Sequence, residues 1–344
     1  MVKWDRFMRG TPLKSSTTLI LPPAPNLLTA MRVGFDAITN HVVLILFPVA
    51  LDLLLWMGPR LRLTQLIRTS FDQMVAVYNV QDEQMAELAR SLREMWVVIA
   101  EQLNLLGTLR TYPVGVSSLF VSRLPVSTPI GTPVSFEIVS LSWVALAWVL
   151  LTLVGLALGS LYFGAVAQVA LHGQVSWRET TRDWFRSTIQ VFYLAIFWAV
   201  LGFIIAIPGS IFLSLAMVGG LSLAQCVILI YVGLVAWLII PLLFSPHGIF
   251  VLHQNMRTSV RTSVKMTRLT MPMTLPFILV ILVISTGMNL LWLTPAETSW
   301  WMVVGVFGHA FVTTALLAAS FVYYRDAERW TSRVYPLGGM SGKS

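Results

Sequence analysis

The chain has 344 residues, of which 56% are hydrophobic and only 11% charged, with a net charge of +8 and a mean hydropathy of +0.77. Soluble domains carry about 25% charged residues, so this composition excludes a soluble domain. Apolar runs long enough to cross a bilayer recur along the chain. We therefore predict an all-α fold: a polytopic integral membrane helical bundle. The single cysteine, Cys226, excludes an internal disulfide.

The N-terminal part of the chain is predicted to be a short tail, one span and a large extramembrane region. Residues 1–36 contain five basic residues and no apolar core, so we expect a cytoplasmic segment without a cleavable signal peptide. Residues 37–57 form the first span, and residues 58–137 an extracytoplasmic helical cap and loop. Within the cap, apolar residues recur at helical spacing over 63–78 and 85–106, which predicts two amphipathic helices.

The cap ends in a loop rich in turn-forming residues. Its sequence at 111–133 is TYPVGVSSLFVSRLPVSTPIGTP, with four prolines. Structureless loops of this length are uncommon. We therefore expect either a packed cap or a segment inserted into the membrane surface, and the sequence leaves both open.

The remaining chain is predicted to hold five more spans. The six spans lie at residues 37–57, 138–171, 191–215, 221–244, 273–293 and 300–323. Pro208-Gly209 is expected to bend the third span. The organisation then continues as an amphipathic helix with spans three and four at 172–246, an amphipathic helix with spans five and six at 247–324, and a cytoplasmic tail at 325–344.

Basic residues predict the orientation of the bundle. They concentrate in the N-terminal tail, in the two short loops that precede spans three and five, and after the last span. The long region 58–137 is neutral, with seven arginines and seven carboxylates. By the positive-inside rule, both termini face the cytoplasm. We expect a multi-pass protein of the bacterial plasma (inner) membrane.

Two short segments place basic residues on one stripe of a helix. In QNMRTSVRTSVKMTRLTMPM, residues 254–273, four such residues fall within about 80° at roughly 100° per residue, beside an apolar row of Leu252, Met256, Val260 and Val264. We interpret both stripes as contacts with anionic lipid headgroups or with a cytoplasmic or membrane protein partner, and nucleic acid is excluded for want of a binding module. The stripe residues are Arg178, Arg182, Arg186, Arg257, Arg261, Lys265 and Arg268.

Polar residues inside predicted spans are the other candidate site, because polar groups are costly in lipid. The candidates for an intramembrane polar cluster are Asp52, Gln225, Asn289 and His309. For Asp52, near the outer end of the first span, we expect a hydrogen-bonding partner among Arg60, Arg62, Gln225 and Asn289. The alternatives are a ligand site under the cap, or interhelical hydrogen bonds that fix packing; Gly155 and Gly159 are likewise interpreted as helix-packing residues.

The chain carries no recognised signature of an enzyme. It lacks His-Glu-x-x-His, Gly-x-Ser-x-Gly, a Walker loop and carboxylate pairs at ligand spacing. We therefore predict a non-enzymatic protein without a catalytic residue, metal site or cofactor.

Two stretches of the second half carry a family resemblance. These are SPHGIFVLHQNMRTSVRTSVKMTRLTMP, residues 245–272, and ASFVYYRDAER, residues 319–329. They resemble a group of bacterial polytopic proteins related to the membrane domain of glycerophosphodiester phosphodiesterases. The catalytic barrel of that family has no counterpart here, so the resemblance implies a helical membrane fold and no activity.

The sequence favours a structural, scaffolding or accessory membrane component. The alternative is the permease subunit of a transporter coupled to a cytoplasmic ATPase, with Asp52 near the pathway. An intramembrane enzyme is a third reading. The composition alone does not choose among them.

Overall fold

The computed structural model describes residues 23–78, 83–121, 125, 127–218 and 220–340. Its α-helices are α1 (Leu27–Asn40), α2 (Leu46–Met57), α3 (Thr64–Tyr78), α4 (Glu83–Gln102), α5 (Leu141–His172), α6 (Trp177–Val218), α7 (Leu221–Ile239), α8 (His247–Val251), α9 (Met256–Leu269), α10 (Met271–Trp292) and α11 (Met302–Met340). Short 3-10 helices and strands connect them: η1 (Val42–Ile45), β1 (Arg60–Arg62), η2 (Leu105–Leu109), η3 (Leu119–Val121), β2 (Ser135–Glu137) and η4 (Ile240–Leu242).

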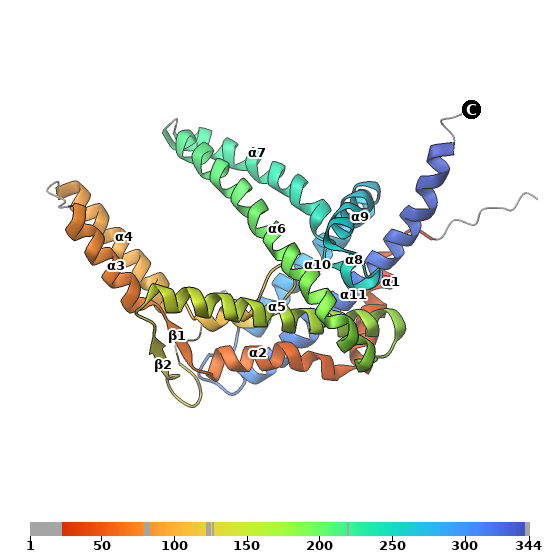
Figure 1. The fold of residues 1–344 in the computed structure, drawn as a ribbon, viewed down its shortest axis with the longest axis horizontal. Helices are drawn as coiled ribbons and strands as arrows, with labels where there is room; N and C mark the ends of the chain where they lie inside the picture. The colour runs from red at the N-terminus through yellow and green to blue at the C-terminus, as the bar shows by residue number, and fades with distance from the viewer. Residues whose placement is uncertain (1–22, 79–82, 122–124, 126, 219, 341–344) are drawn as a thin grey trace, which may run out of the picture.

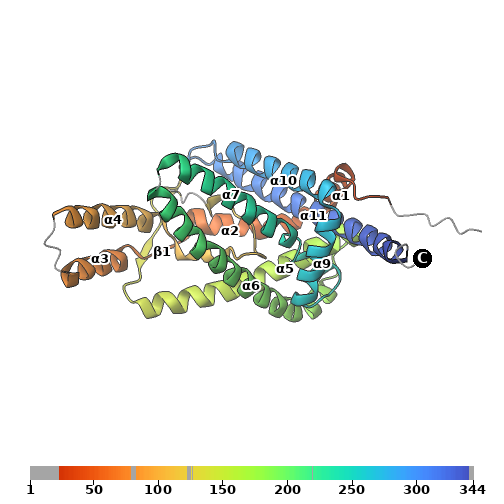
Figure 2. The ribbon, with the colours of Figure 1, turned by 90° about the horizontal axis from the view of Figure 1, so that it is seen from above.

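Helix α11 is the centre of the bundle. Its most apolar window is 61% buried, against 11–22% in the other long apolar helices. Helices α1, α2, α5, α9 and α10 all contact it. Helices α2, α5, α10 and α11 follow the long axis of the molecule, with the α3–α4 hairpin at one end and the C-terminus at the other (Figure 2). The α6–α7 hairpin leans away from this body (Figure 1).

The described part of the chain has five helices long and apolar enough to cross a membrane, or six if α1 and η1–α2 together form one span. The prediction of a helical bundle is confirmed at this level. The prediction of an all-α fold missed one small feature, a parallel pairing of β1 with β2. It joins Arg60 to Ser135 and Arg62 to Glu137, and so closes the base of the α3–α4 hairpin.

The first predicted span, at 37–57, is a pair of helices in the structure. Helices α1 and η1–α2 are bent by 92° at His41, whose backbone N–H bonds Ile38 O at 3.0 Å. Residues 27–36, predicted as part of a cytoplasmic tail, belong to α1 and pack on α11. The contact is close because Gly34 has no side chain: an added Cβ would lie 2.4 Å from the Ala319 backbone nitrogen.

The amphipathic helix predicted at the start of residues 172–246 and the third span are one continuous helix, α6. Helix α6 continues through Pro208, which has no N–H to donate. Beside this proline, Gly209 leaves room for the ring of Tyr231 on α7, and the Tyr231 hydroxyl donates to Ile205 O. The tail predicted at 325–344 is likewise helical as far as Met340, where α11 ends, and its last four residues lie outside the described part of the chain.

The cap contains the two predicted amphipathic helices, now seen as the antiparallel hairpin α3–α4. Two ion pairs join them, Arg68 to Glu101 and Arg93 to Asp72, both at 2.9 Å. The first part of the loop that follows packs into the bundle, where Val114, Val116 and Phe120 are buried, whereas Ile130 further along it is 69% exposed.

Candidate functional site

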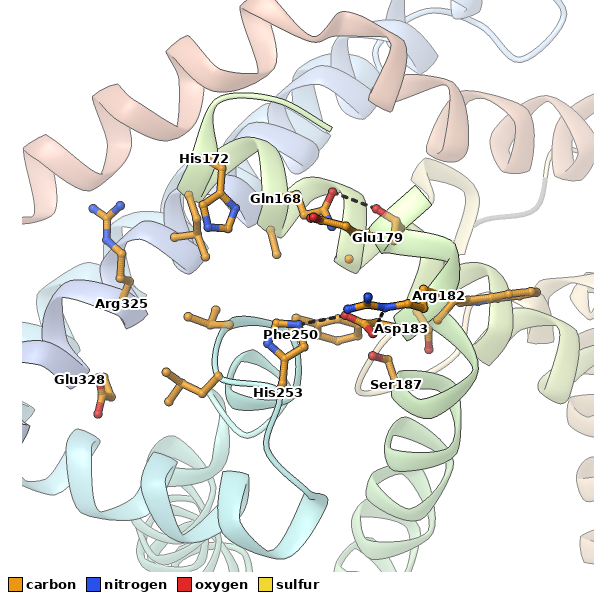
Figure 3. Close-up of a pocket in the computed structure, with 18 of the residues that line it drawn as sticks. Gln168, His172, Glu179, Arg182, Asp183, Ser187, Phe250, His253, Arg325 and Glu328 are labelled. Atoms are coloured by element: carbon orange, nitrogen blue, oxygen red, sulfur yellow. Dashed lines mark hydrogen bonds and ion pairs between the residues drawn. The ribbon is translucent and has the colours of Figure 1, made fainter. Parts of the chain in front are cut away.

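A pocket of about 460 Å³ opens at the end of the bundle that holds α9 and the C-terminal part of α11, called here the basic end. The ends of α5 and α11, the first turns of α6 and the α8–α9 connection line this basic-end pocket (Figure 3). Its floor is formed by small and apolar side chains such as Gly164, Ala167 and Phe250. Its charged and imidazole side chains are His172, Glu179, Arg182, Asp183, His253, Arg325, Glu328 and Arg329.

A turn between α5 and α6 shapes one wall of the pocket. Helix α5 ends at Gly173, which adopts a left-handed φ of 74° that favours glycine. The Gln168 side-chain oxygen then accepts hydrogen bonds from Ser176 N at 3.0 Å and Thr180 Oγ1 at 2.9 Å. This glutamine fixes the start of α6 against the end of α5.

The α8–α9 connection forms the opposite wall and is held by α6. Asp183 Oδ2 lies 3.3 Å from His253 Nε2, and Asp183 Oδ1 lies 3.5 Å from Arg182 Nε. Arg186 donates to His253 O at 2.5 Å and to Asn255 Oδ1 at 3.3 Å. The first basic stripe therefore divides: Arg182 lines the pocket, Arg186 anchors the connection, and Arg178 is exposed.

Part of the pocket's charge has no ion-pair partner among the described residues. Arg325 pairs with Asp326 at 2.9 Å, outside the pocket lining. Within the described residues, Arg329, Glu179 and Glu328 form no ion pair. The pocket thus offers an exposed guanidinium with carboxylates nearby, above an apolar floor.

The second basic stripe lies on the exposed face of α9, as its helical spacing predicted. The exposed residues are Arg257, Arg261, Lys265 and Arg268. The Arg268 guanidinium carbon also lies 5.5 Å from the centre of the Trp237 ring. Three residues of the apolar row, Met256, Val260 and Val264, are partly buried and pack against the core. The fully buried residues of α9 are Ser259, Ser263, Met266 and Thr267.

The serines bind carbonyl oxygens that α7 and α8 leave free. In a regular helix, Pro241 O would accept from Ser245 N, and Ser245 O from Ile249 N. Tighter turns redirect these donors to Leu242 O and Pro246 O. Ser263 Oγ instead donates to Pro241 O at 2.7 Å, and Ser259 Oγ to Ser245 O at 2.6 Å. Hydroxyls one helical turn apart thereby hold α9 against the break that follows α7.

The structure divides the predicted intramembrane polar cluster. His309 Nδ1 lies 2.8 Å from Asn289 Oδ1, so these two members join α11 to α10. Gln225 is exposed on α7 and contacts neither of them. Asp52 is fully buried and accepts from Ser118 Oγ at 2.5 Å and from Leu119 N at 2.8 Å.

The four expected partners of Asp52 were wrong. Arg60 donates to Pro125 O instead, where burial lowers its pKa from the usual value. The true partners lie in the loop 104–121, because this loop folds back between α5 and α11. The residue that sequence analysis missed is Arg110, which interacts electrostatically with both Asp52 and His309. The turn-forming residues at 111–133 were the sequence feature that could have indicated a packed loop near Asp52.

Two glycines of α5 admit the inserted loop. An added Cβ at Gly155 would lie 2.4 Å from Leu109 O, and one at Gly159 would lie 2.8 Å from Gly115 Cα. Their small size, interpreted from sequence as helix–helix packing, therefore accommodates a loop. Ser117 Oγ completes the contact from the other side, 2.9 Å from Thr313 Oγ1 on α11.

The inserted loop borders a second cavity of about 470 Å³, called here the loop cavity. It lies between the loop and the middle of α5 and α11. Its lining combines one cation with several hydroxyls. Its lining includes Arg110, Thr111, Ser117, Tyr162, Phe163 and Leu317.

Within the described ranges, no three His, Cys, Asp or Glu residues gather closely enough to hold a metal ion. A scan against family models and searches of curated proteins and solved structures give no match to this chain. The fold and the apolar helices by themselves define a helical bundle compatible with a multi-pass membrane protein.

Proposed function

We propose that the chain is a non-enzymatic multi-pass membrane protein that binds the phosphate-bearing head of an anionic lipid in the basic-end pocket. The observation that carries this is the pocket itself, with the exposed Arg329 and Arg182 above a floor that includes Phe250 and Ala167. An amphiphile presents this same combination of a charged head and an apolar tail. The resemblance to a membrane domain of lipid-related enzymes stays a prediction.

The α6–α7 hairpin supports a membrane location. The large apolar side chains Phe203, Ile204, Leu229 and Ile230 are 63–76% exposed there. Such exposure is costly in water and favourable in lipid. Within a bilayer, this hairpin needs no protein partner to cover it.

The distribution of paired and unpaired arginines supports a cytoplasmic basic end. At the α3–α4 end, Arg68 and Arg93 pair with carboxylates. At the basic end, the exposed Arg257 and Arg261 form no ion pair with the described residues. Unpaired cations near anionic headgroups each contribute about 1 kcal/mol to surface binding. We infer that both termini are cytoplasmic, in a bacterial plasma membrane, with the anionic lipids of that leaflet as the main partners.

Lipid retention by the full-length protein tests the pocket. We expect native mass spectrometry to find less dioleoylphosphatidylglycerol bound to R329Q than to the unchanged chain, with dioleoylphosphatidylcholine as the neutral comparison. Arg333, one turn further along α11, is exposed but does not line the pocket, so R333Q is the matched control. Equal retention by R329Q and R333Q would overturn the proposal.

A soluble ligand is distinguished by adding inorganic phosphate. If the pocket takes the phosphate group alone, phosphate should displace the lipid from the unchanged chain. If the acyl chains contribute through Phe250 and the rest of the floor, lipid retention should survive phosphate in excess.

A further inference from the structure

We propose that the loop cavity and the basic-end pocket are two halves of one route through the bundle, closed between them by the rings of Phe163 and Phe250, and that the route conducts a phosphate-bearing anion. The inference rests on the proposed function for its inner half. It goes beyond that function because it adds movement of the anion across the bundle to its binding.

The two hollows share one wall. Phe163 lines the loop cavity, and the next residue of α5, Gly164, lines the basic-end pocket. On α11, Leu317 lines the loop cavity and Arg325 the basic-end pocket. Eight residues separate these two positions, which is about 12 Å along a helix at about 1.5 Å per residue. The cavities therefore follow one another along the central helix.

Three aromatic rings cluster where the two hollows approach each other. The ring of Phe163 lies 5.7 Å from that of Phe250, which lines the basic-end pocket. Phe321, midway between Leu317 and Arg325 on α11, contacts both rings at 6.0 and 6.4 Å.

Phe250 has the freedom to open this barrier. It is half-buried and belongs to the five-residue helix α8, which ends just before the α8–α9 connection. The facing residue is Gly164, and even an added Cβ there would remain 3.9 Å from Phe250 Cδ1. The glycine therefore leaves space beside the ring on the side of the basic-end pocket.

Charge indicates what the route accepts. The loop cavity holds Arg110 together with the hydroxyls of Thr111, Ser117 and Thr313. The basic-end pocket holds Arg182, Arg325 and Arg329 beside the carboxylates Glu179, Asp183 and Glu328. Arg182 and Arg325 each pair with an aspartate, whereas Arg329 forms no ion pair with a described residue. Guanidinium groups and hydroxyls at both stations suit phosphate oxygens. A free phosphate and a lipid headgroup share this chemistry.

Side-specific labelling tests the closure. In a C226A background, a cysteine at Ser117 is treated with a membrane-impermeant maleimide in right-side-out and inverted vesicles. Gly107, at the edge of the loop cavity, has open space beside it, and Tyr112 is 60% exposed, so we expect labelling from the α3–α4 side. With the rings of Phe163 and Phe250 intact, the cysteine should be labelled from the α3–α4 side only. With F163A or F250A, labelling should lose its side preference.

The control and the second variant keep the test decisive. Phe35 contacts Phe311 at 6.0 Å elsewhere in the bundle, so F35A removes a comparable ring and should leave labelling one-sided. F250L retains more of the buried apolar area than F250A, and should shift labelling in the same direction if F163A fails to fold. One-sided labelling in monodisperse F250A and F250L would overturn the route.

Flux in proteoliposomes identifies the anion. Uptake of radiolabelled inorganic phosphate, and dithionite bleaching of NBD-labelled phosphatidylglycerol in phosphatidylcholine vesicles, are measured for the unchanged chain, F250A and F250A with R110Q. Faster phosphate uptake by F250A assigns a free anion, and faster lipid bleaching assigns a headgroup; R110Q should reduce either. No acceleration of either despite two-sided labelling would overturn anion conduction. Failure of the R329Q lipid test with two-sided labelling would instead remove the proposed function and leave the route.

Discussion

The hydroxyl of Ser118 lies 2.5 Å from Oδ1 of Asp52, although the two residues are 66 positions apart. Leu119 N donates to the same oxygen at 2.8 Å. Oδ2 of Asp52 is buried without a hydrogen-bond partner in the described part of the chain. One carboxylate oxygen therefore fastens the tip of the inserted loop to α2.

The first prediction concerns the stability of Asp52 variants. D52N retains an oxygen that accepts both bonds but loses the carboxylate's interaction with Arg110, so we expect a smaller loss of stability than for D52L. D52L leaves the Ser118 hydroxyl and Leu119 N unpaired, at a cost of roughly 1–3 kcal/mol for each buried group. Thermal unfolding in detergent measures both, with D36N on the exposed face of α1 as the control.

Complementation of a deletion strain separates packing from transport at this residue. If Asp52 only positions the loop, D52N should also complement. A D52N protein that melts like the unchanged chain yet fails to complement would place Asp52 in the function itself.

A second prediction concerns the space that admits the loop. G159A would place a Cβ 2.8 Å from Gly115 Cα, and backbone atoms cannot move aside as a flexible side chain can. We expect a loss of about 1–3 kcal/mol as the loop shifts. The control is G202A in α6, where an added Cβ meets nothing within 4 Å and alanine's helix propensity favours it by up to about 1 kcal/mol. Equal melting temperatures for G159A and G202A would contradict the inserted loop.

The serines of α9 give a third prediction. S259A and S263A each leave a buried backbone carbonyl without its donor, and should each destabilise the protein by about 1–3 kcal/mol. Thr258 lies on the same helix but is exposed, so T258A should have little effect. Melting curves of the three variants provide the measurement. If S263A behaves like T258A, the serine contacts do not hold α9 in place.

The basic stripe of α9 should act on lipid binding. Changing Arg257, Arg261, Lys265 and Arg268 to glutamine should reduce binding to vesicles with phosphatidylglycerol, and the difference from the unchanged chain should shrink as salt screens the charges. Vesicle flotation at low and high salt measures the loss of binding and its dependence on salt. Salt-insensitive binding by the unchanged chain would argue for a protein partner.

The orientation is tested with cysteines at Ser91 and Ser341 in a C226A background. Ser91 lies on α4, and Ser341 lies outside the described residues. A membrane-impermeant maleimide should reach Ser91 from outside the cell and Ser341 only in inverted vesicles. Labelling of both from one side would overturn the inferred topology. Cys226 must be removed first because it is exposed.

The sequence by itself determined the helical bundle and the exposed face of α9. Both follow from local pattern: length and hydropathy identify helices that can cross a bilayer, and charges at helical spacing share one face. The same reasoning correctly expected two amphipathic helices in the cap, α3 and α4. It did not expect the 92° break at His41 or the continuity of α6, because each depends on what packs against the segment.

Only the tertiary structure decided the sites. The hydrophobic pattern of the loop carries no record that Gly155 and Gly159 leave space for it, so Arg110 could not be placed beside Asp52 and His309. Nor does the α9 pattern show that two carbonyls near Pro241 are free to accept from serines. Helical periodicity assigns a residue to a face, whereas the partner on that face comes from chain segments distant in sequence. Hydrogen bonds and cavities between such segments form only when the helices pack.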